Sequence, residues 1–171
     1  MQSPKNWPKD WIVHKFGGTS VADAACFRRV AGIVEARAEP RQAIVLSACR
    51  GVTDALFSVV ATAEAQGETA GKLAALRKRH SDIAEELLSS NEAAPYLAAL
   101  DADLDDIKGV LQTIKLTRSA APSARDLIAG YGEIWSSRLF ARFLDAQGKR
   151  AVQWCDARTV LVVDWGPLGP A

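Results

Sequence analysis

The first residues able to do chemistry stand at the end of an apolar run near the N-terminus. Lys15 is followed by Gly17, Gly18, Thr19 and Ser20. Glycines let a backbone approach an anion closely, and the N–H groups that open a following helix attract negative charge. The pattern is neither a Walker A loop, whose lysine follows its glycines, nor G-x-G-x-x-G. It predicts a phosphate site, and the alternative is a tight turn followed by a capping box that starts at Ser20.

Two further stretches carry polar residues at places where a site could form. Residues 47–53 follow a second apolar run as a strand-to-helix turn, with Thr53 as the expected N-cap of the next helix. Further on, Gly130 and Gly132 precede Glu133 inside a helical pattern. Two glycines in one turn indicate either that a ligand approaches this face or that the helix packs closely on a strand. Glu133 suits an ammonium group, and a solvated helix glutamate is the alternative.

No metal site is expected. His80 falls on the apolar seam of a helix, with no second ligand at a suitable spacing, so we expect a packed histidine. The three cysteines, Cys26, Cys49 and Cys155, show no C-x-x-C pair and no metal-like spacing. We expect them to stay reduced in the cytoplasm.

Length and composition exclude several classes of protein. The chain has 171 residues, of which 49% are hydrophobic and 24% charged, and its net charge is +1. This composition is typical of one globular domain and offers no basic footprint for nucleic acid. Neither a signal peptide nor an apolar run long enough to cross a membrane is visible, so we expect a cytoplasmic protein.

The first third of the chain alternates strands and helices. Strands are predicted at 11–16 and 42–47, and helices at about 21–38 and 53–66. Short connections between such elements are typical of a parallel sheet covered by helices. The fold class is therefore α/β.

The remainder of the chain is mainly helical. Apolar residues at alternating steps of three and four predict an antiparallel helical hairpin over about 69–117. A further helix is predicted from Pro122 to about Ala146, and a third strand at 150–155. The tail, residues 165–171, shows no periodicity, and we expect neither a helix nor a strand there.

Taken together, four motifs in this order resemble those of aspartate kinases. They are Lys15–Val21, Ser47–Thr53, Gly132–Glu133 followed by Ser136, and Asp156–Arg158. The resemblance covers about residues 11–165. It implies an amino-acid-kinase fold, which is a three-layer α/β/α sandwich around a mostly parallel sheet, with the helical hairpin inserted.

The resemblance also implies a reaction. The γ-phosphoryl group of ATP would pass to the β-carboxylate of L-aspartate, giving 4-phospho-L-aspartate, the first step toward lysine, threonine and methionine. Lys15 would be catalytic and would neutralise the transferring phosphoryl group, and Gly17, Gly18 and Ser20 would bind the phosphates of ATP. Mg²⁺ would be bound through those phosphates and not by protein ligands.

The substrate side of the site is implied by the same resemblance. Ala48 and Thr53 would hold aspartate, and Glu133 would receive its ammonium group. We therefore expect Lys15, Thr53 and Glu133 to share one concave site. The resemblance further implies a homo-oligomer that has small-molecule partners and binds neither nucleic acid nor membrane.

The sequence departs from the family pattern in one respect. The F-G-R-G-G-S-D-like segment, the adenine-binding elements and the regulatory ACT domains of aspartate kinases are absent. We interpret residues 11–171 as the N-terminal, aspartate-side part of a kinase domain behind a tail of residues 1–10. Alone it should be inactive, with an exposed apolar face. The alternatives are another amino-acid kinase, of the glutamate, acetylglutamate or nucleoside-monophosphate type, and a non-catalytic aspartate-binding or assembly module.

Overall fold

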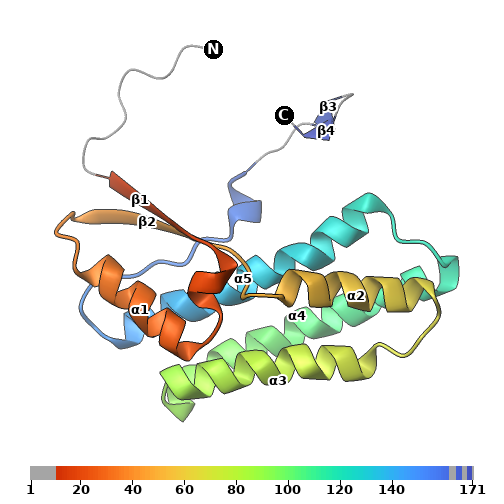
Figure 1. Ribbon diagram of the computed structural model, residues 1–171, viewed down its shortest axis with the longest axis horizontal. Helices are drawn as coiled ribbons and strands as arrows, with labels where there is room; N and C mark the ends of the chain where they lie inside the picture. Colours follow the sequence, from red (N-terminus) through yellow and green to blue (C-terminus); the bar gives the residue numbers. More distant parts are fainter. Residues whose placement is uncertain (1–10, 162–164, 167–168, 171) are drawn as a thin grey trace.

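The computed structural model of the chain describes residues 11–161, 165–166 and 169–170. The predicted tail 1–10 lies outside these residues. The described elements are β1 (Trp11–Phe16), the 3-10 turn η1 (Gly18–Val21), α1 (Ala24–Glu35), β2 (Arg41–Leu46), α2 (Val52–Glu64), α3 (Ala70–Leu87), α4 (Ser90–Thr117), α5 (Pro122–Ala146), η2 (Ala157–Thr159), β3 (Trp165–Gly166) and β4 (Gly169–Pro170). Figure 1 shows the β1–β2 sheet on one side of a body made of helices.

The predicted βαβ unit at the N-terminal end is confirmed. β1 and β2 pair in parallel, with Trp11 opposite Arg41 and Phe16 opposite Leu46, and α1 makes the connection. Side chains alternate between the two faces of a strand, so each strand contributes every second residue to one face. The inner face consists of Ile12, His14, Phe16, Gln42, Ile44 and Leu46, all of them buried or half-buried.

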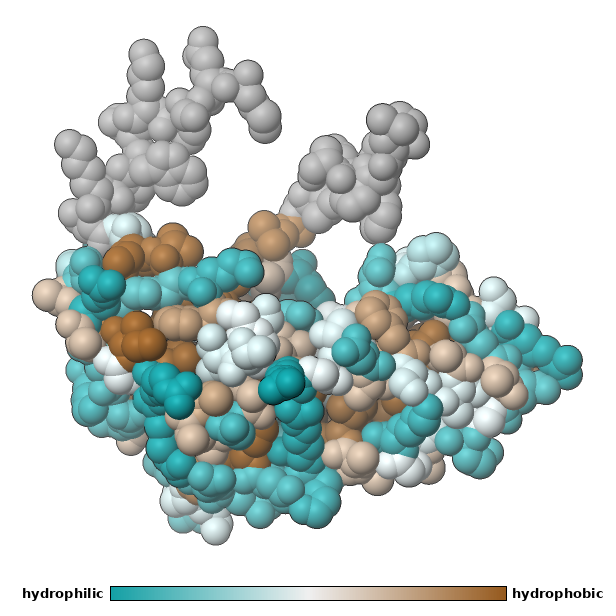
Figure 2. All heavy atoms as spheres, in the orientation of Figure 1, coloured by the Kyte–Doolittle hydropathy of each residue, from teal (hydrophilic) through white to brown (hydrophobic). Residues whose placement is uncertain are grey.

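The opposite, outer face of this sheet is exposed. Trp11, Val13 and Val45 retain 52%, 66% and 49% of their accessible surface, and Lys15 and Arg41 are exposed beside them. In Figure 2 hydrophobic residues form brown areas along the upper side of the molecule, over the strands. No helix of the described residues packs on this face. The second covering layer of the expected sandwich is therefore absent from the described part of the chain.

Helix α1 starts later than predicted. Instead of a helix from Val21, the chain makes the 3-10 turn η1, and Asp23 becomes the N-cap by accepting a hydrogen bond from the Cys26 N–H at 2.8 Å. This bond to the Cys26 N–H lowers the pKa of the Asp23 carboxyl. The capping box at Ser20, considered as the alternative to a phosphate site, does not form, because a carboxylate three residues further on satisfies the helix N-terminus.

Helix α2 also has a different cap from the one predicted. Gly51, with φ of 76°, is the N-cap, and Thr53 lies inside the first turn. This left-handed backbone conformation carries no penalty for glycine but is costly for a residue with a Cβ. The turn therefore closes at the glycine, and Thr53 is wrong as a cap but stands where a ligand at the helix N-terminus could reach it.

Two helices, α3 and α4, occupy the region of the predicted hairpin. They are joined at Leu88 and Ser89, and a capping box between Ser89 and Glu92 opens α4. Ion pairs join Arg77 to Asp101 and Lys115 to Glu68. Most of the predicted seam is buried: Leu73, Leu76, His80, Ile83, Leu100, Leu104, Ile107, Leu111 and Ile114. None of the described helices is long and apolar enough to cross a membrane.

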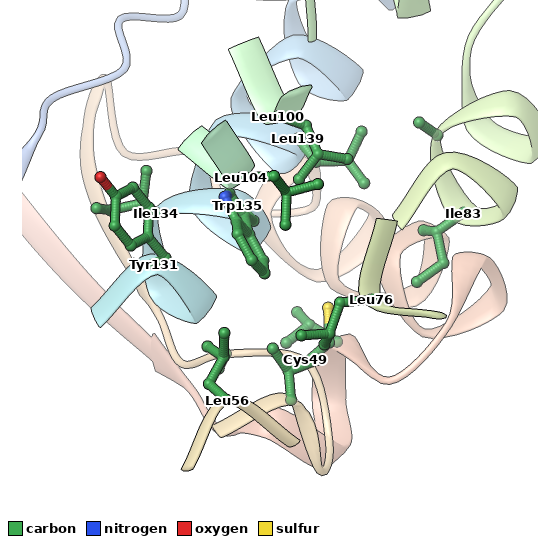
Figure 3. Close-up of a cluster of buried hydrophobic side chains, with 14 of the residues drawn as sticks. Cys49, Leu56, Leu76, Ile83, Leu100, Leu104, Tyr131, Ile134, Trp135 and Leu139 are labelled. Carbon is green, nitrogen blue, oxygen red and sulfur yellow. The ribbon is translucent and has the colours of Figure 1, made fainter. Parts of the chain in front are cut away.

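Helix α5 runs through the middle of the hydrophobic core. Trp135 is fully buried and contacts Tyr131 on its own helix and His80 on α3, with ring centroids 6.0 and 5.0 Å away. Figure 3 shows the Trp135 ring pointing from α5 toward the part of the cluster that contains Cys49, Leu56 and Leu76. The prediction of a helix from Pro122 to Ala146 is confirmed.

The third strand predicted at 150–155 is wrong. Val152 and Trp154 pack against the core while their neighbours are exposed, as in a strand, but the segment forms no ladder with β2. Arg150 donates to the carbonyl oxygens of Arg37 and Glu39. The Trp154 indole donates to Ser137 on α5 at 3.1 Å. The Arg150 bonds attach the segment to the connection between α1 and β2, and the Trp154 bond attaches it to α5. A groove of about 930 Å³ is lined by the segment, β2 and α5.

The tail contains a short antiparallel pair instead of the predicted absence of structure. Trp165 pairs with Pro170 and Gly166 with Gly169, as β3 and β4. The described sheets are thus one parallel and one antiparallel pair.

His80 makes the fold sensitive to acid. The side chain is fully buried, its Nδ1 lies 2.9 Å from the Leu76 carbonyl oxygen, and burial lowers its pKa from 6.5 to about 4. Between these two pKa values His80 is therefore protonated in the unfolded chain and neutral in the folded chain. The stability that the folded protein has with a neutral His80 is fully present above pH 6.5, and it is lost as the pH falls toward 4.

We expect the free energy of unfolding to fall by about 2 kcal/mol more between pH 7 and pH 5 in the parent than in His80→Leu. Urea unfolding at several pH values in this range measures the difference. Exposed carboxyl groups with a lowered pKa, such as that of Asp23, titrate below this pH range and do not contribute to the difference. Equal losses in the two proteins would mean that His80 is not the acid-sensitive group.

Candidate functional site

The carboxyl ends of β1 and β2 bring two of the four sequence motifs together. The Ser47 N–H donates to the Phe16 carbonyl oxygen at 3.1 Å, and the Arg50 N–H donates to that of Gly18 at 3.0 Å. The glycine turn after β1 and the turn after β2 are therefore hydrogen-bonded to each other. The carboxyl edge of a parallel α/β sheet is where ligands bind in folds of this class.

Gly18 is required by this close approach. A Cβ at this position would stand 2.6 Å from the Ala48 carbonyl oxygen, whereas a Cβ at Gly17 would meet nothing within 4 Å. Ser20 closes the turn, since its N–H donates to the Gly17 carbonyl oxygen at 2.9 Å. The two glycines thus differ: Gly18 lets the two turns meet, and Gly17 leaves open space for a ligand.

The third motif reaches the same place from α5. A Cβ at Gly132 would lie 2.7 Å from the Ala48 Cβ and 3.3 Å from Val52, whereas one at Gly130 would meet nothing within 4 Å. Close packing therefore accounts for Gly132 and leaves Gly130 without a structural reason. Because α5 comes so near, the Glu133 carboxylate accepts a hydrogen bond from the Ala48 N–H at 3.3 Å.

Ser136 adds a second attachment between α5 and the end of β2. Its side chain is completely buried, and its hydroxyl lies 2.8 Å from the Ser47 carbonyl oxygen and 3.1 Å from that of Glu133. Gly132 and Ser136 are four residues apart and so lie on one face of the helix. That face is the one that meets the turn after β2.

Lys15 stands at the same end of the sheet but on its outer face. It is opposite Val45 in the ladder and is exposed to solvent. Within residues 11–161 its ammonium group has no hydrogen bond. Thr53 is half-buried in the first turn of α2. The structure thus joins Gly18, Ala48 and Glu133, and the expected approach of Lys15 to Glu133 and Thr53 stays a prediction.

The fourth motif packs on the neighbouring part of α5. The Arg158 guanidinium forms a paired contact with the Asp156 carboxylate, at 2.6 Å for the shorter bond, and lies 5.6 Å from the centre of the Tyr131 ring. The hydrogen bond from Arg158 lowers the pKa of Asp156. Asp156 also accepts from the Arg158 N–H and caps η2. These contacts fix the turn that follows the extended segment 151–156.

A half-buried polar cluster beside this turn was not predicted. The Asp103 carboxylate on α4 accepts from Arg138 at 2.7 Å and from the Trp135 indole at 3.0 Å. The Arg138 guanidinium also lies 4.9 Å from the centre of the Trp154 ring. We call these four residues the Asp103–Arg138 cluster. In the sequence, Asp103 and Arg138 each stand beside the apolar stripe of a predicted helix. Apolar periodicity places such charged residues on the solvent side, so it does not indicate that the two meet.

Neither thiol chemistry nor a protein-held metal ion is supported by the site. Burial raises the pKa of Cys49, next to Ala48, to about 12, so this thiol stays protonated and is a poor nucleophile. In the described residues no group of three His, Cys, Asp or Glu side chains is placed to hold a metal ion. What the arrangement offers is a carboxylate, a glycine turn and the N-terminus of α2 at one sheet edge.

Comparisons with known proteins agree with this arrangement. A model of the amino acid kinase family matches residues 10–164. The bifunctional aspartokinase/homoserine dehydrogenase 1, chloroplastic, of Arabidopsis thaliana is 34% identical over 154 residues, which are 90% of this chain and 17% of the plant protein. The lysine-sensitive aspartokinase 3 of Escherichia coli (strain K12) is 35% identical over 150 residues, which are 88% of this chain and 32% of that enzyme.

A solved structure shows the same fold. Aspartokinase III of E. coli in complex with aspartate and ADP, in its R-state, superimposes with a TM-score of 0.74 and 31% sequence identity. The match covers 89% of this chain and 32% of the solved chain. The chain thus spans about a sixth to a third of the length of these relatives.

Proposed function

The chain belongs to the amino acid kinase family, and on that premise we propose that it forms the aspartate-side part of an aspartate kinase. Its relatives are aspartokinases. The proposed reaction transfers the γ-phosphoryl group of ATP to the β-carboxylate of L-aspartate. Its product, 4-phospho-L-aspartate, is the precursor from which lysine, threonine and methionine are made.

One observation carries the proposal: the Glu133 carboxylate is held against the Ala48 N–H at the carboxyl edge of the sheet. A carboxylate fixed at this edge attracts an ammonium group and repels anions. Thr53, in the first turn of α2, adds a hydroxyl and the positive end of a helix. Together these groups suit the ammonium and carboxylate groups of an amino acid.

The phosphate side of the proposed site follows from the glycine turn. The nucleophile is a carboxylate that is already ionised at neutral pH, so no general base is needed. The difficulty is the repulsion between two anions, which cations and oriented N–H groups relieve. Lys15 would supply the cation, and Gly17, Gly18 and Ser20 would supply N–H and hydroxyl donors.

A magnesium ion fits this scheme only as a companion of the nucleotide. The described residues offer no set of three ligands for it, and Mg²⁺ commonly binds through substrate phosphates with one or two carboxylates. When bound, the ion would neutralise charge on the phosphates. The part of the site supplied by this chain then consists of Lys15, the glycine turn and Ser20.

The exposed outer face supports the view that the site is incomplete here. Lys15 lies on that face beside Val13 and Val45, and the chain spans 32% of E. coli aspartokinase III. In a whole kinase of this family, we propose, further polypeptide covers the face and makes the three-layer sandwich, with α3 and α4 as its antiparallel hairpin. The nucleotide would then bind between the covering part and Lys15.

Calorimetric titration of the 171-residue chain with L-aspartate tests the proposal. We expect saturable binding to the parent and at least a tenfold weaker affinity for Glu133→Gln, because the neutral amide loses the attraction for the ammonium group. The matched control is Glu85→Gln, the same chemical change at an exposed position on α3, which should leave the affinity unchanged.

Competing ligands separate the alternatives. Tighter binding of glutamate or acetylglutamate than of aspartate would identify another amino-acid kinase and contradict the proposed substrate. Aspartate binding without any response to ATP in the complete protein would favour a non-catalytic module. Absence of aspartate binding by the parent would argue against the proposed substrate side of the site.

A further inference from the structure

We propose that Ser136 is the positioning residue that holds Glu133 in register with both turns at the carboxyl edge of the sheet. The proposal rests on the proposed function for its consequence, but its geometry stands alone. Ser136 is fully buried one turn after Glu133, and its hydroxyl donates to the Ser47 carbonyl oxygen at 2.8 Å. No substrate role is assigned to Ser136, because it has no exposed surface.

The bond joins α5 to a continuous set of backbone contacts. Ser47 receives the bond at its carbonyl oxygen and donates its own N–H to Phe16, directly before the glycine turn. Three residues after Ser47, the Arg50 N–H donates to Gly18. Ser136 is therefore linked, through the turn that starts at Ser47, to the residue before the proposed phosphate-binding turn and to Gly18 within it.

The contact between Glu133 and Ala48 needs this support. At 3.3 Å the bond to the Ala48 N–H is longer than the usual 2.9–3.0 Å of an N–H···O bond. Gly132 allows the helix to come near, since it has no Cβ to strike Ala48. An absent side chain permits approach but does not fix a register. The Ser136–Ser47 bond supplies the fixed point four residues along the same face of α5.

This link bears on the distance between the two parts of the proposed site, the one that would bind the substrate ammonium group and the one that would bind the phosphates. Glu133 would receive the substrate ammonium group, and Gly17 and Gly18 would receive the phosphates. Ser136 connects α5, which carries Glu133, with the strand ends, which carry the two glycines. Without its hydroxyl, α5 can slide or tilt on Ala48, and the Glu133 carboxylate leaves the amide.

The test is a double-mutant cycle read by NMR on the full 171-residue chain. The probe is the Ala48 amide proton, whose chemical shift depends on the hydrogen bond to Glu133. Glu133→Gln should move this signal in the parent background. In the Ser136→Ala background the same substitution should move it little, because Glu133 has already left. An equal shift in both backgrounds would overturn the proposal.

The matched control is Ser81→Ala. Ser81 is also buried and donates to a carbonyl oxygen of its own helix, that of Lys78, but lies on α3. The response of Ala48 to Glu133→Gln should persist in this background. Should Ser136→Ala lose cooperative unfolding, Ser136→Cys keeps the side-chain volume with a weak donor and is judged by the same criterion.

Aspartate titration of the same proteins separates this proposal from the proposed function. We expect Ser136→Ala to bind L-aspartate about tenfold more weakly, the loss of roughly one hydrogen bond. If the parent binds no aspartate but the NMR cycle shows coupling, the proposed function fails and the positioning role stands. If aspartate binds and the cycle shows no coupling, the positioning role fails alone.

Discussion

Replacing Gly132 by alanine should lower the free energy of unfolding by about 2–3 kcal/mol, as overpacking of a filled core does. The added Cβ would stand 2.7 Å from the Ala48 Cβ and 3.3 Å from Val52. The Ala48 Cβ cannot move without shifting the backbone of the turn after β2, and Val52 is fully buried in the first turn of α2. The clash outweighs the helix propensity that alanine gains over glycine, which is ~1 kcal/mol.

Gly130→Ala is the matched control for this prediction. It lies on the same helix, two residues earlier, and an added Cβ would meet nothing within 4 Å. It should therefore stabilise the protein by up to about 1 kcal/mol through helix propensity alone. Urea unfolding of both variants gives the comparison. Similar effects in the two proteins would contradict the close contact between α5 and Ala48.

Removing Arg138 from the Asp103–Arg138 cluster should cost about 3 kcal/mol, as breaking a buried ion pair does. The Arg138 and Asp103 side chains are 16% and 14% exposed, and Arg138→Met would leave the Asp103 carboxylate with only the Trp135 indole as a neutral partner. The Trp154 ring would also lose the guanidinium that lies over it. Because methionine keeps most of the side-chain volume, the loss of stability comes mainly from the lost positive charge.

A second substitution shows whether the cost comes from the stranded charge. Asp103→Leu added to Arg138→Met removes both charges, and the double variant should recover at least half of the stability lost by Arg138→Met. Lys78→Met, which breaks the exposed pair with Asp82, should cost less than about 0.5 kcal/mol. A double variant as unstable as the sum of its parts would contradict a coupled pair.

The sequence predicted the elements well because their signals are local. Strands β1 and β2, helix α5 and most of the buried seam of α3 and α4 follow from apolar periodicity, which depends on neighbours three or four residues away. The residues that cap helices α1 and α2 were not predicted correctly. Asp23 and Gly51 compete with nearby Ser20 and Thr53, and only the backbone path decides which residue satisfies a helix N-terminus.

The site was predicted in part and for a similar reason. Gly18, Ala48 and Glu133 come from three of the four motifs and meet at one edge of the sheet. Gly18 and Ala48 lie in the turns after β1 and β2, and Gly132 lets the middle of α5 come close enough for Glu133 to accept from Ala48. The strand expected at 150–155 did not form: Arg150 bonds to the Glu39 carbonyl oxygen, just before β2, and Trp154 bonds to Ser137 on α5. Such contacts are long-range, and the sequence pattern does not contain them.

The bare side of the sheet also governs how copies of this chain behave in solution. Trp11, Val13 and Val45 would attract another such surface, while Lys15 and Arg41 on the same side repel it. Added salt screens the repulsion and strengthens the apolar attraction. Dilute buffers of low ionic strength should therefore keep the purified polypeptide dispersed, and concentrated sulfate should precipitate it early.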